Sequence, residues 1–227
     1  MAPRKFWPTL WVLSALTIPL THSTTLVAAH YKGGIIMGAD SRTSRGGYIA
    51  NRFATKLRCV TPGICLARSG SAADTQSLAE YLVLELADLA LEVALDRGEE
   101  EGDEWPRVLS AAHILRRRCY AEKSSLSASL ICAGWDGHLG LQIYSVPIGG
   151  SLVRMEKYAL SGSGGSYIYG WCDRTWRPDF TREECIRFVT SAVELAMERD
   201  CSSGGGVNLV CIEPRKPMYQ IEPCAKA

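Results

Sequence analysis

The order of strand-like and helix-like segments is the feature that most constrains the fold of this chain. Strands come in groups and helices come in pairs, which differs from the regular alternation of a doubly wound parallel sheet. The sequence therefore predicts an α+β fold built in layers. The predicted strands cover Thr24–Tyr31, Ile35–Asp40, Tyr48–Asn51, Leu57–Val60, Ile64–Arg68, Leu126–Ala133, Leu139–Val146, Ser151–Leu160, Val207–Ile212 and Met218–Glu222, and the predicted helices cover 71–95, 108–119, 166–176 and 181–198.

Short sequence motifs mark where two of the predicted helices begin. Ser71 with Asp74 and Thr181 with Glu184 have the spacing of capping boxes at helix starts. The first helix carries two apolar stripes, which predicts that it buries two faces. The stripes are Leu78, Leu82, Leu86, Leu89 and Val93, and Leu84, Leu91 and Leu95. The acidic run 99–104 predicts an exposed loop. No repeat or linker follows Thr24, so residues 24–227 are predicted to form one domain.

Residues 1–23 differ from the rest. Arg4 and Lys5 precede an apolar run over 6–20, which is shorter than the roughly 20 residues of a membrane-spanning helix. This pattern is typical of a secretory signal peptide, and a propeptide that is removed or a disordered leader would also account for it.

Charge and cysteine content exclude several classes of protein. The formal net charge is +1, and the absence of a long basic block argues against nucleic acid or an anionic membrane as the main partner. Nine cysteines without a C-x-x-C pair predict free thiols in a reducing compartment. The four histidines form no H-E-x-x-H motif, and no residue pattern implies a metal or an organic cofactor.

Thr24 opens the first predicted strand directly after the leader. If the chain is cut between Ser23 and Thr24, one residue carries both a hydroxyl and a free α-amine. Such an amine titrates near neutrality, so it can accept the proton of its own hydroxyl. The alternative is an ordinary β-branched strand residue.

Several spaced blocks decide between these readings, because together they resemble the catalytic β subunits of the proteasome core particle. The resemblance is greatest to the caspase-like type, which cleaves after acidic residues. It implies a four-layer αββα sandwich of two antiparallel sheets flanked by helices, the N-terminal-nucleophile hydrolase fold. The blocks lie at 24–28, 33–42, 48–56, 68–74, 162–170 and 196–204.

The resemblance also implies residue roles. Thr24 aligns with the nucleophile, Asp40 and Lys56 with the charged pair beside it, and the N–H of Gly70 with the oxyanion-hole donor. Ser163, Asp200 and Ser203 align with the polar group that orients the threonine amine and a water.

Specificity is expected from Arg68, since a guanidinium can pair with a substrate Asp or Glu. Other substrate-binding walls align with Thr43, Ser44, Ala54 and Ala72, and nearby Arg58 is expected to add positive potential. The alternative for Arg68 is a bond to a neighbouring subunit.

The resemblance implies that the leader is a propeptide that masks Thr24. In this position before the nucleophile the family usually has glycine, and this chain has Ser23. Three functions follow: a threonine endopeptidase, a structural ring subunit that keeps its leader because of Ser23, and a secreted N-terminal-nucleophile hydrolase. The first two imply paralogous α and β subunits in stacked heptameric rings in cytoplasm and nucleus. Their substrates would be unfolded polypeptides.

Overall fold

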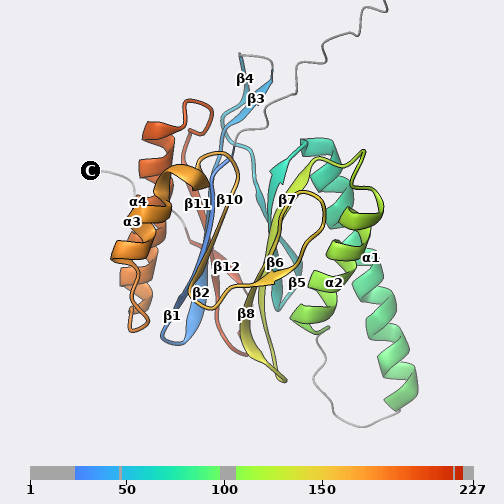
Figure 1. The fold of residues 1–227 in the computed structure, drawn as a ribbon. Coiled ribbons are helices and arrows are strands. Elements are labelled where there is room, and N and C mark those ends of the chain that lie inside the picture. The colour runs from blue at the N-terminus through green and yellow to red at the C-terminus, as the bar shows by residue number, and fades with distance from the viewer. Residues whose placement is uncertain (1–23, 46–47, 98–105, 217, 222–227) are drawn as a thin grey trace, which may run out of the picture.

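Two sheets lie face to face at the centre of the molecule, and a pair of helices covers the outer face of each (Figure 1). The computed structural model describes residues 24–45, 48–97, 106–216 and 218–221. All strand pairings between described residues are antiparallel. The predicted α+β fold, a four-layer αββα sandwich, is confirmed.

The first sheet has the strand order β10-β1-β2-β11-β12. Its outer face packs against α3 (Gly165–Thr175) and α4 (Arg182–Arg199). The strands are β1 (Leu26–Tyr31), β2 (Gly34–Asp40), β10 (Tyr158–Ser161), β11 (Val207–Ile212) and β12 (Tyr219–Ile221).

The second sheet has the order β5-β6-β7-β8-β9 and packs against α1 (Ala72–Arg97) and α2 (Val108–Ala121). Its strands are β5 (Leu57–Thr61), β6 (Ile64–Gly70), β7 (Ala128–Asp136), β8 (Gly140–Val146) and β9 (Val153–Arg154). A separate hairpin of β3 (Thr43–Arg45) and β4 (Tyr48–Asn51) projects beyond the sandwich (Figure 1).

Strand β2 shows why the sequence reads as a continuous apolar run. All seven of its residues are buried, because both faces of the sheet are covered. Ile36 points to the helix layer of α3 and α4, whereas Ile35 and Met37 point to the layer between the sheets. The side-chain period of two thus divides one strand between two cores.

The structure corrects the single strand predicted over Ser151–Leu160. Here the chain forms β9 on the second sheet and then crosses to form β10 on the first. The intervening residues leave the ladder at Met155, whose N–H still donates to the Ile143 carbonyl at 2.9 Å. A strand that changes sheets looks continuous in sequence because both halves are rich in apolar residues.

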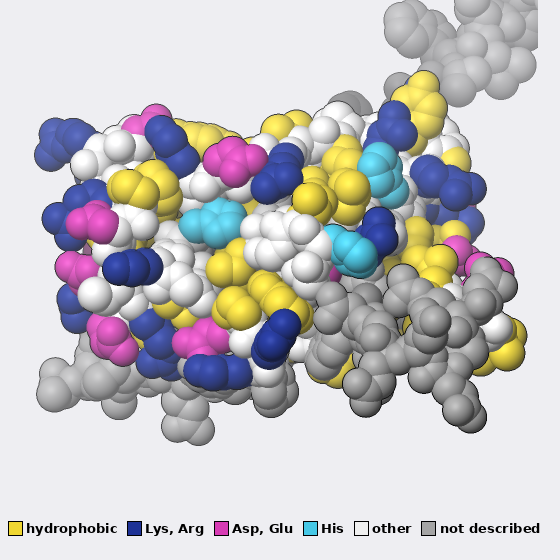
Figure 2. Space-filling view, turned by 90° about the horizontal axis from the view of Figure 1, so that it is seen from below, with side chains coloured by type: hydrophobic (Ala, Val, Ile, Leu, Met, Phe, Trp, Pro, Cys, Tyr) yellow, Lys and Arg dark blue, Asp and Glu magenta, His cyan; other side chains and the backbone are white. Residues whose placement is uncertain are grey.

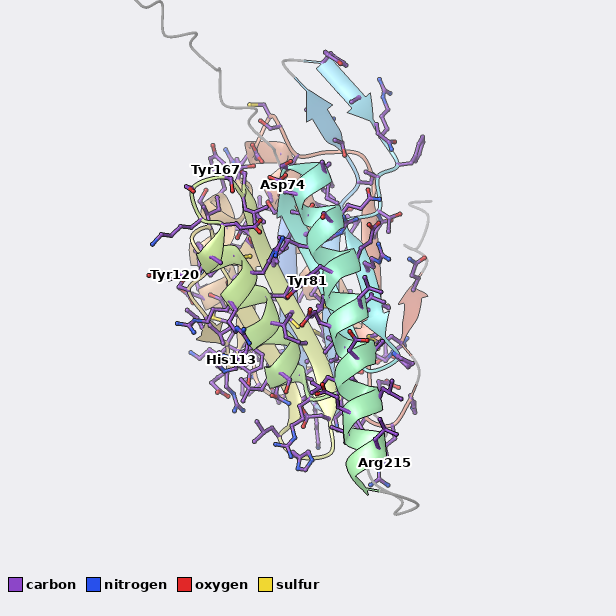
Figure 3. The ribbon with its side chains drawn as sticks, turned by 90° about the vertical axis from the view of Figure 1, so that its right-hand side faces the viewer. Asp74, Tyr81, His113, Tyr120, Tyr167 and Arg215 are labelled. Carbon is purple, nitrogen blue, oxygen red and sulfur yellow. The ribbon has the colours of Figure 1, made fainter. Side chains whose placement is uncertain are left out.

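Within the single chain, α1 buries one of the two apolar faces predicted for it. Leu78, Leu82 and Leu86 are buried against the sheet and α2, whereas the second stripe of Leu84, Leu91 and Leu95 is exposed. Figure 3 shows α1 and α2 side by side on this face, with Tyr81 between them, and the Arg118 guanidinium lies 5.1 Å from the Tyr81 ring centre.

The two predicted capping boxes differ in outcome. Thr181 and Glu184 form both hydrogen bonds of the box at the start of α4. At α1, Ser71 Oγ accepts from the Asp74 N–H at 3.4 Å, but the Asp74 carboxylate accepts from the Ser127 N–H instead. Asp74 is one carbon shorter than the usual Glu, and it ties the helix start to the segment before β7. The acidic run 99–104 lies outside the described residues.

The face shown in Figure 2 carries no extended patch of positive or negative charge, because Lys and Arg side chains are mixed with Asp and Glu side chains there. Within the described part of the chain, no helix combines the length and apolar character needed to span a bilayer.

Candidate functional site

The antiparallel register gathers the candidate residues at one end of the sandwich. The start of β1 pairs with the ends of both neighbours, since Leu26 lies opposite Ala39 of β2 and Ser161 of β10. Thr24 before β1, Asp40 at the end of β2 and Ser163 after β10 therefore meet. On the facing sheet, Lys56 precedes β5 and Gly70 ends β6, so the candidate site spans both sheets.

Asp40 and Lys56 form an ion pair inside the protein. Lys56 Nζ lies 2.7 Å from Asp40 Oδ1, and the Asp40 side chain is fully buried. Burial lowers the pKa of Lys56 and outweighs the opposing attraction of Asp40. A buried pair differs from a solvated surface pair in that loss of one member leaves the other as an uncompensated buried charge.

Both carboxylate oxygens of Asp40 have further donors. Oδ1 accepts from the Thr25 N–H at 2.9 Å, and Oδ2 accepts from the N–H groups of Gly204 and Arg42 at 3.0 and 3.3 Å. This set fixes the carboxylate that holds Lys56. The sequence interpretation missed Thr25, Arg42 and Gly204. The sequence signal for all three is position, since Thr25 and Gly204 directly follow Thr24 and Ser203, and Arg42 lies two residues after Asp40.

Ser163, Asp200 and Ser203 form a connected group beside Thr24. Asp200 Oδ2 accepts from Ser163 Oγ at 2.6 Å and from Ser203 Oγ at 2.7 Å. The Thr24 backbone nitrogen lies 3.4 Å from Ser163 Oγ, and Thr25 Oγ1 donates to Ser203 Oγ at 2.9 Å. The structure thus brings together three residues that the sequence separates from Thr24 by more than 130 positions.

Two glycines allow the backbone to approach closely here. Gly70 has φ +113°, and a Cβ on it would collide with the Ser127 carbonyl. Gly162 has φ +82°, and a Cβ on it would collide with the carbonyl of Thr24 itself. Both backbones lie in the region that L side chains rarely adopt. Gly70 is therefore required by the backbone at this strand end, whatever its further role.

A cavity of about 270 Å³ opens beside Thr24. It brings together the predicted wall residues and adds four that the sequence interpretation did not name. The predicted lining residues are Thr24, Thr43, Ser44, Ala54, Lys56, Arg68, Gly70 and Ala72, and the additional ones are Asn51, Thr55, Thr75 and Gln76. Asp40, Ser163, Asp200 and Ser203 are not among the lining residues. Ser23 lies outside the described residues.

Arg68 lines the cavity from β6, two residues before Gly70. Its Nη2 donates to the Thr55 carbonyl at 3.0 Å, and its Nε is buried without a hydrogen-bond partner among the described residues. Burial lowers the pKa of Arg68, and the nearby Arg58 charge adds to that effect. A guanidinium that lines a cavity is suited to bind an anionic group.

A family model described as "Proteasome subunit" matches residues 20–212. "Proteasome subunit beta type-6" of Dictyostelium discoideum is 43% identical over 190 residues, which is 84% of each chain. "Probable proteasome subunit beta type-1" of Schizosaccharomyces pombe is 45% identical over 189 residues, 83% of this chain and 79% of the relative.

"Proteasome subunit beta type-9" of Rattus norvegicus is 43% identical over 189 residues, 83% of this chain and 81% of the relative. The matched region includes every candidate residue described above. The chain belongs to the proteasome β-type subunit family.

Proposed function

We propose that this chain is a threonine endopeptidase subunit of the proteasome core particle, with Thr24 as its N-terminal nucleophile after removal of residues 1–23. The observation that carries the proposal is the buried Lys56–Asp40 pair, whose lysine lines the same cavity as Thr24. A buried ammonium with a lowered pKa beside a hydroxyl favours loss of the hydroxyl proton.

The proposed reaction forms an acyl-enzyme. Thr24 Oγ1 attacks the substrate carbonyl, its proton passes to the Thr24 α-amine, and the N–H of Gly70 donates to the developing oxyanion. Collapse of the intermediate breaks the peptide bond, and the amine proton goes to the leaving nitrogen. A water then cleaves the ester, which restores the Thr24 hydroxyl.

The group of Ser163, Asp200 and Ser203 would hold the Thr24 amine and that water in place. Its support is the 3.4 Å separation of the Thr24 nitrogen from Ser163 Oγ, together with the shared bonds to Asp200. Since the Thr24 nitrogen is an amide while the leader is attached, the proposal requires cleavage after Ser23.

Cleavage after acidic residues is proposed from Arg68, because this residue lines the cavity beside Thr24 and a guanidinium can pair with a substrate carboxylate. The walls Thr43, Ser44, Ala54 and Ala72 are small, which leaves room for the guanidinium and the substrate side chain. Assembly with paralogous α and β subunits in stacked rings, and a cytoplasmic and nuclear location, belong to the same proposal. Free thiols at eight described cysteines support a reducing compartment.

Intact mass of the subunit in the purified particle tests the nucleophile. We expect a species that begins at Thr24, and Thr24→Ala should abolish turnover while the variant still assembles. A subunit that retains its leader mass would overturn the proposal and would favour the second candidate, a structural ring subunit. The observation behind that candidate is Ser23, which stands where the family usually has glycine.

Arg68→Gln tests the specificity. The ratio of kcat/KM for a peptide with Glu before the cleaved bond to that for the matching Gln peptide should fall by about 10-fold or more, since a charged hydrogen bond contributes roughly 1.5–3 kcal/mol. Glu and Gln have nearly the same shape, so this ratio isolates the charge. An unchanged ratio would contradict the role of Arg68.

A further inference from the structure

A second guanidinium lies next to Arg68 on the same side of the sheet. Arg58 of β5 is directly opposite Leu66 of β6, and Arg68 follows Leu66 by two positions. Arg58 and Arg68 are therefore diagonal neighbours across the two strands, a relation that separates Cα atoms by about 7–8 Å. Leu66 points toward α1 and α2, so both arginines lie on the face that these helices cover.

Helix α1 brings one carboxylate to this pair of arginines. Glu80 Oε1 lies 3.8 Å from Arg58 Nη1, and both side chains are partly exposed. The same oxygen accepts from Gln76 Nε2 at 3.1 Å. Gln76 lines the cavity beside Thr24, so one turn of α1 connects the cavity wall to the Arg58–Glu80 pair.

The charges of Arg58 and Glu80 shift the pKa of Arg68 in opposite directions. The Arg58 charge lowers the pKa of Arg68, after the larger effect of burial, and the Glu80 charge raises it. With all three side chains charged, the group carries a net charge of +1. Loss of Arg58 alone leaves a net charge of zero, and loss of Glu80 alone leaves +2.

We propose that Arg58 and Glu80 are opposing specificity-determining residues, which set how strongly the Arg68 cavity prefers an acidic substrate side chain to a neutral one. Arg58 strengthens that preference, and Glu80 weakens it. The inference rests on the proposed function, in which Arg68 receives the side chain before the cleaved bond. Neither residue contacts the substrate, since both act through the electrostatic potential at the cavity.

The effect is modest because the pair is partly solvated. Coulomb attraction at about 8 Å in a screened environment corresponds to roughly a two- to fivefold change in affinity for one unit of charge. This attraction acts on the substrate carboxylate in the bound state, so we expect the change mainly in KM.

The test measures the Glu-to-Gln ratio of kcat/KM, as defined above, in assembled particles. Arg58→Gln should lower the ratio by about two- to fivefold, Glu80→Gln should raise it by a similar factor, and the double variant should return to within about twofold of the parent. Arg58→Lys should retain the parent ratio. All of these shifts should shrink when salt shortens the Debye length from about 30 Å to 8 Å, which a purely structural effect would not do.

Matched controls are Glu92→Gln on the same helix and Arg116→Gln on α2, both exposed and away from the cavity. The inference is overturned if Arg58→Gln and Glu80→Gln stay within the range of these controls, or if both shift the ratio in one direction. If Arg68→Gln still lowers the ratio in that case, only this inference fails. If Arg68→Gln also has no effect, the proposed specificity itself fails.

Discussion

At the scale of single residues, the candidate site depends on the hydrogen bonds that fix the Asp40 carboxylate. Asp40 receives four donors, of which three are backbone N–H groups and one is Lys56. Backbone donors are fixed by the fold, so the carboxylate is oriented before any substrate binds. This arrangement makes Lys56 the member of the pair whose chemistry a substitution can probe.

Lys56→Met should remove the buried ammonium and leave Asp40 uncompensated. We expect peptide turnover by the assembled particle to fall by at least about 100-fold, and the purified chain to lose roughly 3–5 kcal/mol of unfolding free energy. The double variant Lys56→Met/Asp40→Asn should regain much of that stability without regaining turnover. Turnover close to the parent value for Lys56→Met would contradict the proposed mechanism.

At the scale of elements, Asp136 joins a strand pair to a helix. From the end of β7 its carboxylate accepts from the N–H of Val108 at the start of α2, from Leu139 and His138 in the β7–β8 turn, and from the Gln142 side chain. Burial alone would raise the pKa of Asp136, but these four donors outweigh it and the pKa is lowered.

A lowered pKa gives the sign of the pH dependence. The stability that the Asp136 carboxylate contributes is fully present above its unfolded pKa of about 3.9 and is lost as pH falls through the lower folded value. Asp136→Asn should cost about 1–3 kcal/mol near neutral pH and should flatten the acid limb of the stability curve. Chemical denaturation of both chains between pH 2 and 7, roughly spanning these pKa values, would measure it. An unchanged acid limb would contradict this assignment.

At the scale of the whole molecule, the site is divided between two sheets. Thr24 and Asp40 come from the first sheet, whereas Lys56, Arg68 and Gly70 come from the second. The apolar layer between the sheets therefore sets the distance between Thr24 and Lys56 (Figure 1). Packing in this layer should affect chemistry as well as stability.

Two isoleucines test this division, since both are fully buried. Ile143 lies between the sheets, and Ile64 lies between the second sheet and its helices. Each Ile→Ala change should cost about 2–5 kcal/mol in denaturant unfolding. Only Ile143→Ala should also lower kcat per assembled particle, because only it loosens the spacing of the two halves. An equal loss of kcat in Ile64→Ala would show that the layers are not separable in this way.

The order of elements and the Thr181 capping box could be predicted from the sequence, because periodicity and capping depend on near neighbours. The resemblance located the candidate residues from Thr24 to Ser203. The crossing from β9 to β10 could not be predicted, since apolar character does not say which sheet a residue joins. That the single chain leaves the second stripe of α1 uncovered could not be predicted either, because an apolar helix face does not identify what covers it.

The sequence by itself determined the layered fold and the residue types available for chemistry, since local patterns and motif spacing encode both. Only the tertiary structure decided that Asp40 and Lys56 form a buried pair, that Gly204 and Arg42 hold the carboxylate, and that Arg58 and Glu80 lie beside Arg68. These contacts depend on strand register and on the facing of two sheets, and both follow from packing between segments far apart in the chain.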